Sequence, residues 1–281
     1  MDPIDEHRAV VARSFPDLAL RSFVPVRGGW TFHTYDVNGE WIVQLPRNDY
    51  ARARLLEQIE RLPSLARELS TSIPAPAFVS ADPPAMAYPK LEGVRADRAR
   101  DGLWPERLGR ALYDLHSVPP EFIGLRAKTA EHVREERRIS CTELADVVMP
   151  RLRPEDRDRA TALIAALVDD DRLWRFAPCV IHGDLAPEHV LVSATGDLVG
   201  ILDWEEVAVG DPAADFAWVT SVPEVGERAL AAYGGAPDAA FLDRARLAHA
   251  FVPWHEVDHG VRKGQEEFVT SGLERVLAHL P

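Results

Sequence analysis

Residues 180–192 read VIHGDLAPEHVLV, and this stretch of the sequence decides the fold. Residues 200–204 follow closely and read GILDW. The two motifs place the polar side chains of Asp184, His189 and Asp203 within twenty residues, between short apolar runs of β-forming residues. Polar positions at such fixed spacing favour a catalytic loop followed by a metal-binding loop. A purely structural strand–loop–strand is the alternative.

The chemistry of phosphoryl transfer explains this spacing. The reaction needs a positioned acceptor hydroxyl, one or two Mg²⁺ ions and a triphosphate that is held still. In kinases one Asp accepts the hydroxyl proton, a residue shortly after it holds a metal, and a second Asp holds the metal that bridges the phosphates. On this pattern Asp184 is the catalytic residue, and His189 and Asp203 are the metal ligands.

These residues resemble the aminoglycoside phosphotransferase family, which contains small-molecule kinases with a protein-kinase-like fold. The family stretch reads His-Gly-Asp-Leu, usually with Asn five residues after the Asp, then Asp-Trp or Asp-Phe, then Gly-Asp-Pro with a further Asp. Residues 210–215 read GDPAAD, so this chain departs from the pattern only at the Asn, which is His189. His-Val-Leu at that point is similar to the aminoglycoside 2″-phosphotransferase branch.

The assignment of His189 to the metal is implied by this resemblance. Coordination chemistry alone does not support it, because Mg²⁺ prefers hard oxygen ligands to imidazole nitrogen. A histidine that only braces the loop by hydrogen bonds is therefore the alternative.

The resemblance implies an α+β, two-lobed protein-kinase-like fold. We expect a small β-rich N-lobe over residues 1–90 and a larger, mainly helical C-lobe over residues 91–281, joined by a hinge at 89–93. Hydrophobic periodicity predicts elements in a matching order. The expected helices cover 3–15, 51–69, 105–116, 129–147 and 154–170, and the expected strands cover 23–26, 33–37, 41–45, 85–88 and 199–202.

The N-lobe is the expected site for the phosphate donor, ATP or GTP. Gly28 and Gly29 lie where the family has its nucleotide-covering loop, although a plain hairpin turn explains them equally well. The nucleotide base would pack at the hinge. Because Pro89 has no N–H to donate, base recognition falls to backbone groups such as those of Tyr88 or Leu91.

The N-lobe also carries the main departure from the family. Gln44 stands where the family has the cation that holds the donor phosphates, and Gln58 stands where its glutamate partner is expected, with Glu57 as a competing candidate. Replacing both members avoids a buried, unpaired charge, and two amides can hydrogen-bond each other. We expect an active enzyme with altered donor affinity. A weak or degenerate kinase is the alternative.

The resemblance gives the remaining candidates their roles. Asp215 resembles the family's buried Asp that braces the catalytic loop, and His182 and Asp211 are assigned structural roles beside it. Acidic residues after the Gly-Asp-Pro element and near the C-terminus contact amines of the drug in the 2″-branch. By position, the acceptor-binding candidates are Glu224, Glu227, Trp254, Glu256 and Asp258. Glu205 is a further candidate, because it directly follows Asp203-Trp204 and so lies near the expected reaction centre.

The charge of the chain is uneven. Its net value is −13, and residues 91–281 hold 34 acidic and 22 basic residues, whereas residues 1–90 hold 11 and 10. An acidic lobe attracts a cationic small molecule and disfavours nucleic acid and anionic membrane, although acidity for solubility alone explains it equally well. We find no membrane-spanning stretch and no signal peptide, and two cysteines without metal spacing suggest the cytoplasm. Monomer and dimer both remain possible.

The sequence therefore predicts an Mg²⁺-dependent O-phosphotransferase. It would move the γ-phosphate of ATP or GTP to a hydroxyl of a cationic antibiotic, with an aminoglycoside as the first candidate and resistance as the outcome. Phosphorylation of a macrolide, of a tuberactinomycin peptide or of a host metabolite would use the same residues. A non-catalytic nucleotide binder is a fourth reading, motivated by Gln44 and Gln58.

Overall fold

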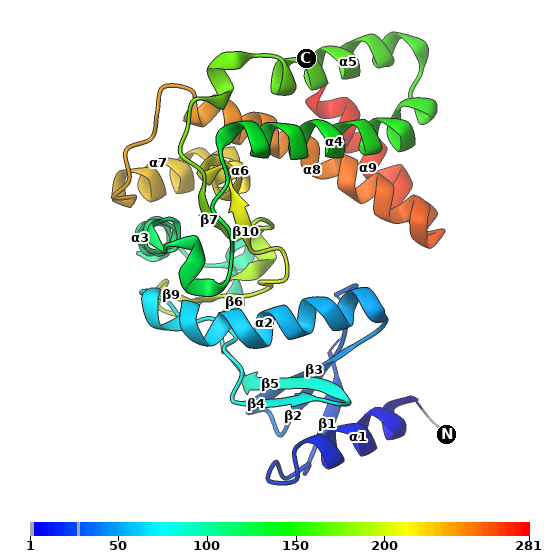
Figure 1. Ribbon diagram of the computed structural model, residues 1–281, viewed down its shortest axis with the longest axis vertical. Helices are drawn as coiled ribbons and strands as arrows, with labels where there is room; N and C mark the ends of the chain where they lie inside the picture. Colours follow the sequence, from blue (N-terminus) through cyan, green and yellow to red (C-terminus); the bar gives the residue numbers. More distant parts are fainter. Residues whose placement is uncertain (1–2, 27–28) are drawn as a thin grey trace.

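The computed structural model describes residues 3–26 and 29–281 of the chain. Figure 1 shows a small β-rich lobe at the bottom and a larger, mainly helical lobe above it. This α+β arrangement confirms the predicted fold class. We keep the boundary at residue 90 as a proposal.

The small lobe is built around a five-stranded antiparallel sheet with the strand order β1-β2-β3-β5-β4. Its elements are α1 (Pro3–Ser14), β1 (Phe23–Pro25), β2 (Phe32–Val37), β3 (Trp41–Pro46), α2 (Asp49–Glu68), β4 (Phe78–Ala81) and β5 (Pro84–Pro89). Successive strand side chains point to opposite faces. Accordingly Ala85 and Ala87 pack in one cluster with α1, whereas Met86 and Tyr88 pack in another with α2. The sheet lies between the two helices (Figure 1).

The elements expected from the sequence are confirmed, with ends that shift by at most two residues. The β2–β3 turn is one residue longer than the two-residue turn that Asn38-Gly39 indicated, because Val37 pairs with Trp41. Asn38 and Gly39 both have positive φ, 62° and 73°, as such turns require. The sequence pattern did not indicate β4, an edge strand in which no residue is buried.

The larger lobe carries the 180–192 stretch on two small antiparallel ladders. One ladder joins β7 (Cys179–Ile181) to β10 (Ala208–Gly210), and the other contains β6 (Val94–Arg95), β8 (Val190–Val192) and β9 (Leu198–Ile201). The stretch therefore forms a strand, a loop and a second strand. Strand β9 then leads directly to Asp203.

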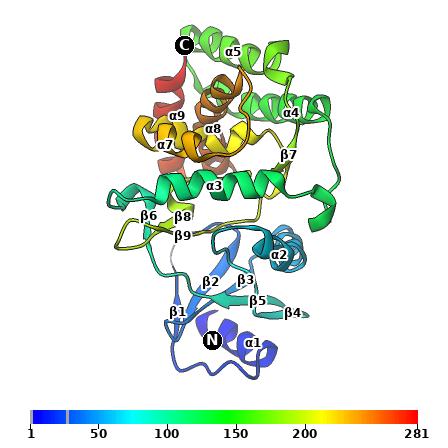
Figure 2. The same cartoon turned by 90° about the vertical axis from the view of Figure 1, so that its left-hand side faces the viewer.

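Helices surround these ladders and form two separate hydrophobic clusters. The helices are α3 (Trp104–Ser117), α4 (Ala130–Val148), α5 (Pro154–Val168), α6 (Ala217–Ser221), α7 (Pro223–Ala232), α8 (Phe241–Lys263) and α9 (Glu266–His279). The first cluster, here called the loop core, packs Leu108 and Leu112 of α3 with Ile201 of β9, and α3 crosses directly above β9 in Figure 2. The second, the helix core, joins α4 and α5 to α8 and α9 through residues such as Leu144 and Phe251.

The loop between α2 and β4 joins the small lobe to strand β9. Ser72 forms a parallel bridge with Gly200, and the Ser72 carbonyl accepts a hydrogen bond from the N–H of Ile201 at 3.0 Å. The small lobe is thereby connected to the strand that ends at Asp203. Among residues 3–26 and 29–281, every helix is too short or too polar to cross a membrane.

Candidate active site

The loop between β7 and β8 is held by Asp215, a fully buried carboxylate. One of its oxygens accepts a hydrogen bond from the N–H of His182 (2.8 Å), and the other accepts one from Gly183 (3.0 Å). Gly183 has φ +85°, and a β-carbon there would lie 2.5 Å from the backbone oxygen of Glu206. Only glycine fits this position. The motif glycine therefore lets the loop after β9 lie directly against the loop that carries Asp184.

The same carboxylate also contacts a helix. His116, near the end of α3, places Nε2 3.1 Å from Asp215 and Nδ1 2.8 Å from the hydroxyl of Tyr233. Burial alone would raise the pKa of Asp215, but the hydrogen bonds from His116 and from the backbone N–H of Gly183 hold that pKa below its usual value. The local sequence around His116 did not indicate either of these contacts, because Asp215 and Tyr233 lie about a hundred residues further along the chain.

His182 connects the two functional loops. Its buried ring donates from Nε2 to the carbonyl of Leu202 at 2.9 Å, directly before Asp203. Its Nδ1 accepts from the N–H of Asp184 at 3.3 Å. Burial lowers the pKa of His182, so the ring is neutral and can donate at one nitrogen while it accepts at the other. One side chain therefore positions both Asp184 and the approach to Asp203.

The Asp184 carboxyl lies at the exposed surface of its loop. The surrounding protein still removes part of its hydration, and this raises the pKa of Asp184; His189 opposes the shift, whereas Asp203 and Glu206 add to it. A carboxylate with a raised pKa is a stronger base than an ordinary one. This suits a group that takes a proton from an acceptor hydroxyl.

His189 and Asp203 lie side by side and fit a shared metal ion. His189 Nε2 is 3.4 Å from an Asp203 oxygen, and its Nδ1–H donates to the carbonyl of Asp184 at 2.8 Å. A metal-binding histidine usually donates its second ring N–H to such an oxygen, which leaves the other nitrogen free to coordinate. The described residues contain no cluster of three or more possible protein ligands. Donor phosphates would therefore have to complete the coordination, as in kinases.

Two glutamates after Asp203 join the lobes. Glu205 accepts a hydrogen bond from the Thr31 hydroxyl (2.9 Å), and Glu206 accepts one from the Tyr50 hydroxyl (3.0 Å). Burial and the neighbouring Asp203 raise the pKa of Glu205 to about 7. The second oxygen of Glu205 is buried and has no partner in the described part of the chain. Sequence reasoning placed Glu205 near the reaction centre but missed both contacts.

The nucleotide-binding residues expected in and next to the small lobe are only partly described by the structure. Gly28 lies outside the described residues, and Gly29 has φ +80° with open space around it. Tyr88 is buried, and this burial, with a smaller effect of the Asp203 carboxylate, raises the pKa of its hydroxyl. Leu91 packs against Gly200, two residues before the loop that leads to Asp203. The hinge segment thus lies next to the strand that leads to the metal site.

The amide pair differs from what we expected. Gln58 is buried against the sheet, whereas Glu57 turns outward and pairs with Arg54 and Arg61 at 3.0 Å, so Gln58 occupies the inward position. Gln44 Oε1 and Gln58 Nε2 are both buried without a hydrogen-bond partner among residues 3–26 and 29–281. The expected mutual hydrogen bond is therefore absent from this structure. Each amide keeps one polar atom that is not satisfied by the protein.

One acceptor-binding prediction needs correction. Trp254 has no exposed surface and packs beside Phe251 in the helix core, so it cannot line an open cleft. Helical spacing correctly placed Trp254 and Asp258 on neighbouring positions of α8, one turn apart. Spacing alone could not show that the tryptophan end of this face is covered by other helices.

The other distant candidates lie at or near the surface of the larger lobe. Glu256 pairs with Arg275 at 2.6 Å, and Asp258 pairs with Arg262 at 2.7 Å. Glu224 and Glu227 are exposed on α7. The structure thus brings Glu205 next to the catalytic loops, whereas these four acidic residues lie on α7 and α8.

Asp211 begins the turn that leads to Asp215. Its side chain accepts from the N–H of Ala213 at 3.0 Å and from the buried guanidinium of Arg244 at 2.8 Å. Asp238 pairs with the same guanidinium at 2.7 Å. Asp211 therefore fixes the start of this turn against α8.

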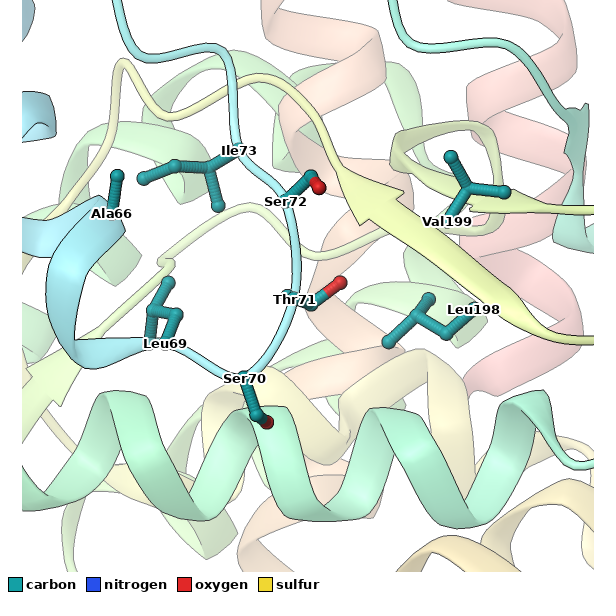
Figure 3. A pocket seen from close by; sticks show the side chains of 8 residues that line it. All are labelled: Ala66, Leu69, Ser70, Thr71, Ser72, Ile73, Leu198 and Val199. Atoms are coloured by element: carbon teal, nitrogen blue, oxygen red, sulfur yellow. The ribbon is translucent and has the colours of Figure 1, made fainter.

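One cavity lies away from these residues. It measures about 550 Å³ and lies between the end of α2 and strand β9, as Figure 3 shows. Its lining consists of Ala66, Leu69, Ser70, Thr71, Ser72, Ile73, Leu198 and Val199. No residue of the catalytic or metal loop borders it, so we do not assign a substrate to it.

Comparison with known proteins adds three relatives. The chain is 26% identical to viomycin phosphotransferase of Streptomyces vinaceus, over 96% of this chain and 98% of that protein. It is also 26% identical to the uncharacterized protein YcbJ of Bacillus subtilis (strain 168), over 85% and 83% of the two chains. Among solved structures, the GDP and kanamycin complex of APH(2″)-IIIa superposes with a TM-score of 0.86 at 21% identity, over 98% of each chain.

A profile of the phosphotransferase enzyme family matches residues 22–250, most of the chain. The matched region runs from the first strand of the small lobe into α8 and includes both functional loops. The solved structure supports the same fold independently. The chain therefore belongs to the phosphotransferase enzyme family and is a small-molecule phosphotransferase.

Proposed function

We propose that this protein moves the γ-phosphate of ATP or GTP to a hydroxyl of a cationic small-molecule antibiotic, in an Mg²⁺-dependent reaction that gives resistance. An aminoglycoside is the first candidate acceptor. The observation that carries the proposal is the grouping of three side chains: the Asp184 base lies beside His189 and Asp203, which face each other across 3.4 Å.

Each of these residues has its own task. Asp184 orients the acceptor hydroxyl and takes its proton as the oxygen attacks the phosphorus. His189 and Asp203 would hold Mg²⁺, which when bound neutralises charge on the donor phosphates. Behind them, His182 and Asp215 keep the two loops in register through the buried hydrogen bonds described above.

The donor would lie against the small lobe. The side-chain amides of Gln44 and Gln58 can donate to phosphate oxygens, but they do so without a positive charge. Backbone groups of Tyr88 or Leu91 would face the base, and the loop with Gly28 and Gly29 would cover the phosphates. Weaker phosphate binding than in a relative with a cation at position 44 follows from this arrangement.

A cationic acceptor is supported by charge. Asp203 and Glu206 both add to the raised pKa of Asp184 and of Glu205, so acidic side chains gather here, and the larger lobe holds most of the net charge of −13. Such a site attracts cations and repels polyanions. Glu224, Glu227, Glu256 and Asp258 stay candidates for more distant acceptor amines.

The test is transfer from γ-labelled ATP and GTP, with Mg²⁺, to a panel that contains kanamycin, viomycin and a macrolide. We expect label on one cationic drug and no label with the Asp184→Ala variant. Label on the macrolide alone would show that the acceptor is a macrolide, in place of an aminoglycoside. Nucleotide binding without transfer to any drug would favour a host metabolite, and no binding of either nucleotide would overturn the proposal.

A further inference from the structure

The glutamines at positions 44 and 58 cannot form the ion pair that positions the corresponding helix in kinases. In kinases a cation on the third strand and a glutamate on the following helix tie that helix to the sheet, and this contact must form for activity. Here Gln44 and Gln58 occupy those positions and do not hydrogen-bond each other. Helix α2 packs on the sheet through apolar residues such as Leu55, and no ion pair between Gln44 and Gln58 adds to this packing.

A different polar contact reaches the same helix at its N-terminal turn. The Tyr50 hydroxyl donates to Glu206 at 3.0 Å, and Arg54 Nε donates to the Tyr50 hydroxyl at 3.3 Å. The Arg54 guanidinium also lies 5.2 Å from the centre of the Tyr50 ring, and it pairs with Glu57 at 3.0 Å. Tyr50 is therefore fixed from its own helix and extends its hydroxyl to the other lobe.

Glu206 also contacts the catalytic loop through its backbone. Its backbone oxygen lies so close to Gly183 that no side chain fits between them. Gly183 directly precedes Asp184. A displacement of Glu206 would therefore push on the loop that carries the catalytic carboxylate.

Two neighbouring contacts hold the lobes together on the same side. The Thr31 hydroxyl donates to Glu205 at 2.9 Å. The ring of Trp30 stacks on His259 of α8, with 3.4 Å between ring centres, and meets Phe268 of α9 edge-on. The segment between β1 and β2 and the start of α2 thus both contact the larger lobe.

We propose that Tyr50 is a positioning residue which, through Glu206, holds α2 against the catalytic loop and supplies the link that Gln44 and Gln58 do not. This inference rests on the proposed phosphotransferase function. Tyr50 touches no reacting atom. Its effect is on the fraction of molecules in which α2, the metal loop and Asp184 are aligned.

Tyr50→Phe is the test, because it keeps the ring and removes only the hydroxyl. We expect kcat to fall about tenfold, as loss of one hydrogen bond to a charged group can produce, with little change in the KM of the acceptor. Tyr113→Phe makes the same chemical change on α3 and should leave kcat unchanged. Thermal unfolding of both variants checks that they are folded.

A second variant separates positioning from general damage. Gln44→Lys together with Gln58→Glu restores an ion pair between β3 and α2, so adding Tyr50→Phe to this background should cost less than threefold in kcat, by the reasoning of a double-mutant cycle. If Tyr50→Phe costs the same in both backgrounds, or nothing in either, the inference is wrong.

Hydrogen exchange gives a readout that does not need activity. In Tyr50→Phe, amides of residues 49–58 should exchange faster than in the unchanged protein and in Tyr113→Phe. If the unchanged protein transfers phosphate to no acceptor but this acceleration is seen, the proposed function fails, whereas the link from Tyr50 to Glu206 is supported. If transfer is normal and neither kcat nor exchange responds to Tyr50→Phe, the positioning role of Tyr50 is wrong and the proposed function is unaffected.

Discussion

The catalytic loops of the larger lobe and the amide pair of the small lobe differ in how their buried polar groups are satisfied. In the larger lobe, Asp215 and His182 use buried hydrogen bonds to hold the loops of Asp184 and Asp203. In the small lobe, the amides at the position of the phosphate-binding cation each keep a buried atom without a partner in the described chain. Buried unsatisfied polar atoms are costly. The loops of Asp184 and Asp203 are thus braced within the protein, whereas Gln44 and Gln58 each leave one buried atom that a ligand could satisfy.

The largest expected effect concerns the catalytic loop of the larger lobe. Asp184→Ala should lower kcat by about 10²–10⁴, the usual contribution of a positioned base. Steady-state transfer assays measure this, with thermal unfolding as the folding control. Near-normal transfer by this variant would remove Asp184 from the mechanism.

The next prediction concerns the metal. His189→Ala should raise the Mg²⁺ concentration for half-maximal activity by about 10–100-fold, and His189→Asn, the usual family residue, should recover most of it. A chelator should abolish transfer by the unchanged protein, and added Mg²⁺ should restore it. Unaltered Mg²⁺ dependence in His189→Ala would mean that the histidine only braces the loop.

Asp215→Asn tests the buried network by stability. Whichever way the new amide is turned, its NH2 group faces one backbone N–H, that of His182 or that of Gly183, so the free energy of unfolding should fall by about 2 kcal/mol. Denaturant titration measures the loss. Asp158→Asn, the same change at an exposed site on α5, should stay within about 0.5 kcal/mol of the unchanged protein. Equal effects at both positions would contradict a bracing role for Asp215.

The smallest expected effect concerns the two glutamines of the small lobe. Gln44→Lys combined with Gln58→Glu should lower the KM for the nucleotide by roughly fivefold, because a charged donor binds phosphate more strongly than an amide. Gln44→Lys alone should bind less well than the pair, since it leaves a buried charge without a partner. A higher KM in the double variant would show that the amides are adapted to the donor as they stand.

The sequence predicted the elements well because their signals are local. Helix α2 and strand β3 show clear apolar periods, and the two loop motifs are short and contiguous. The contacts from Tyr50 to Glu206 and from Thr31 to Glu205 join residues 156 and 174 positions apart. Such pairs leave no local pattern. The burial of Trp254 was missed because helical spacing shows which face of α8 a residue lies on, but not whether other helices of the helix core cover that face.

Helix α8 has a consequence for how such an enzyme can diversify. Phe241 and Ala245, in its first half, belong to the loop core, whereas Phe251 and Val257 belong to the helix core. Effects of changes at well-separated sites usually add. Substitutions in the helix core could therefore shift the second half of α8 while the loop core keeps its packing. Under the proposed function, the range of acceptors could then change through one core while the other preserves turnover.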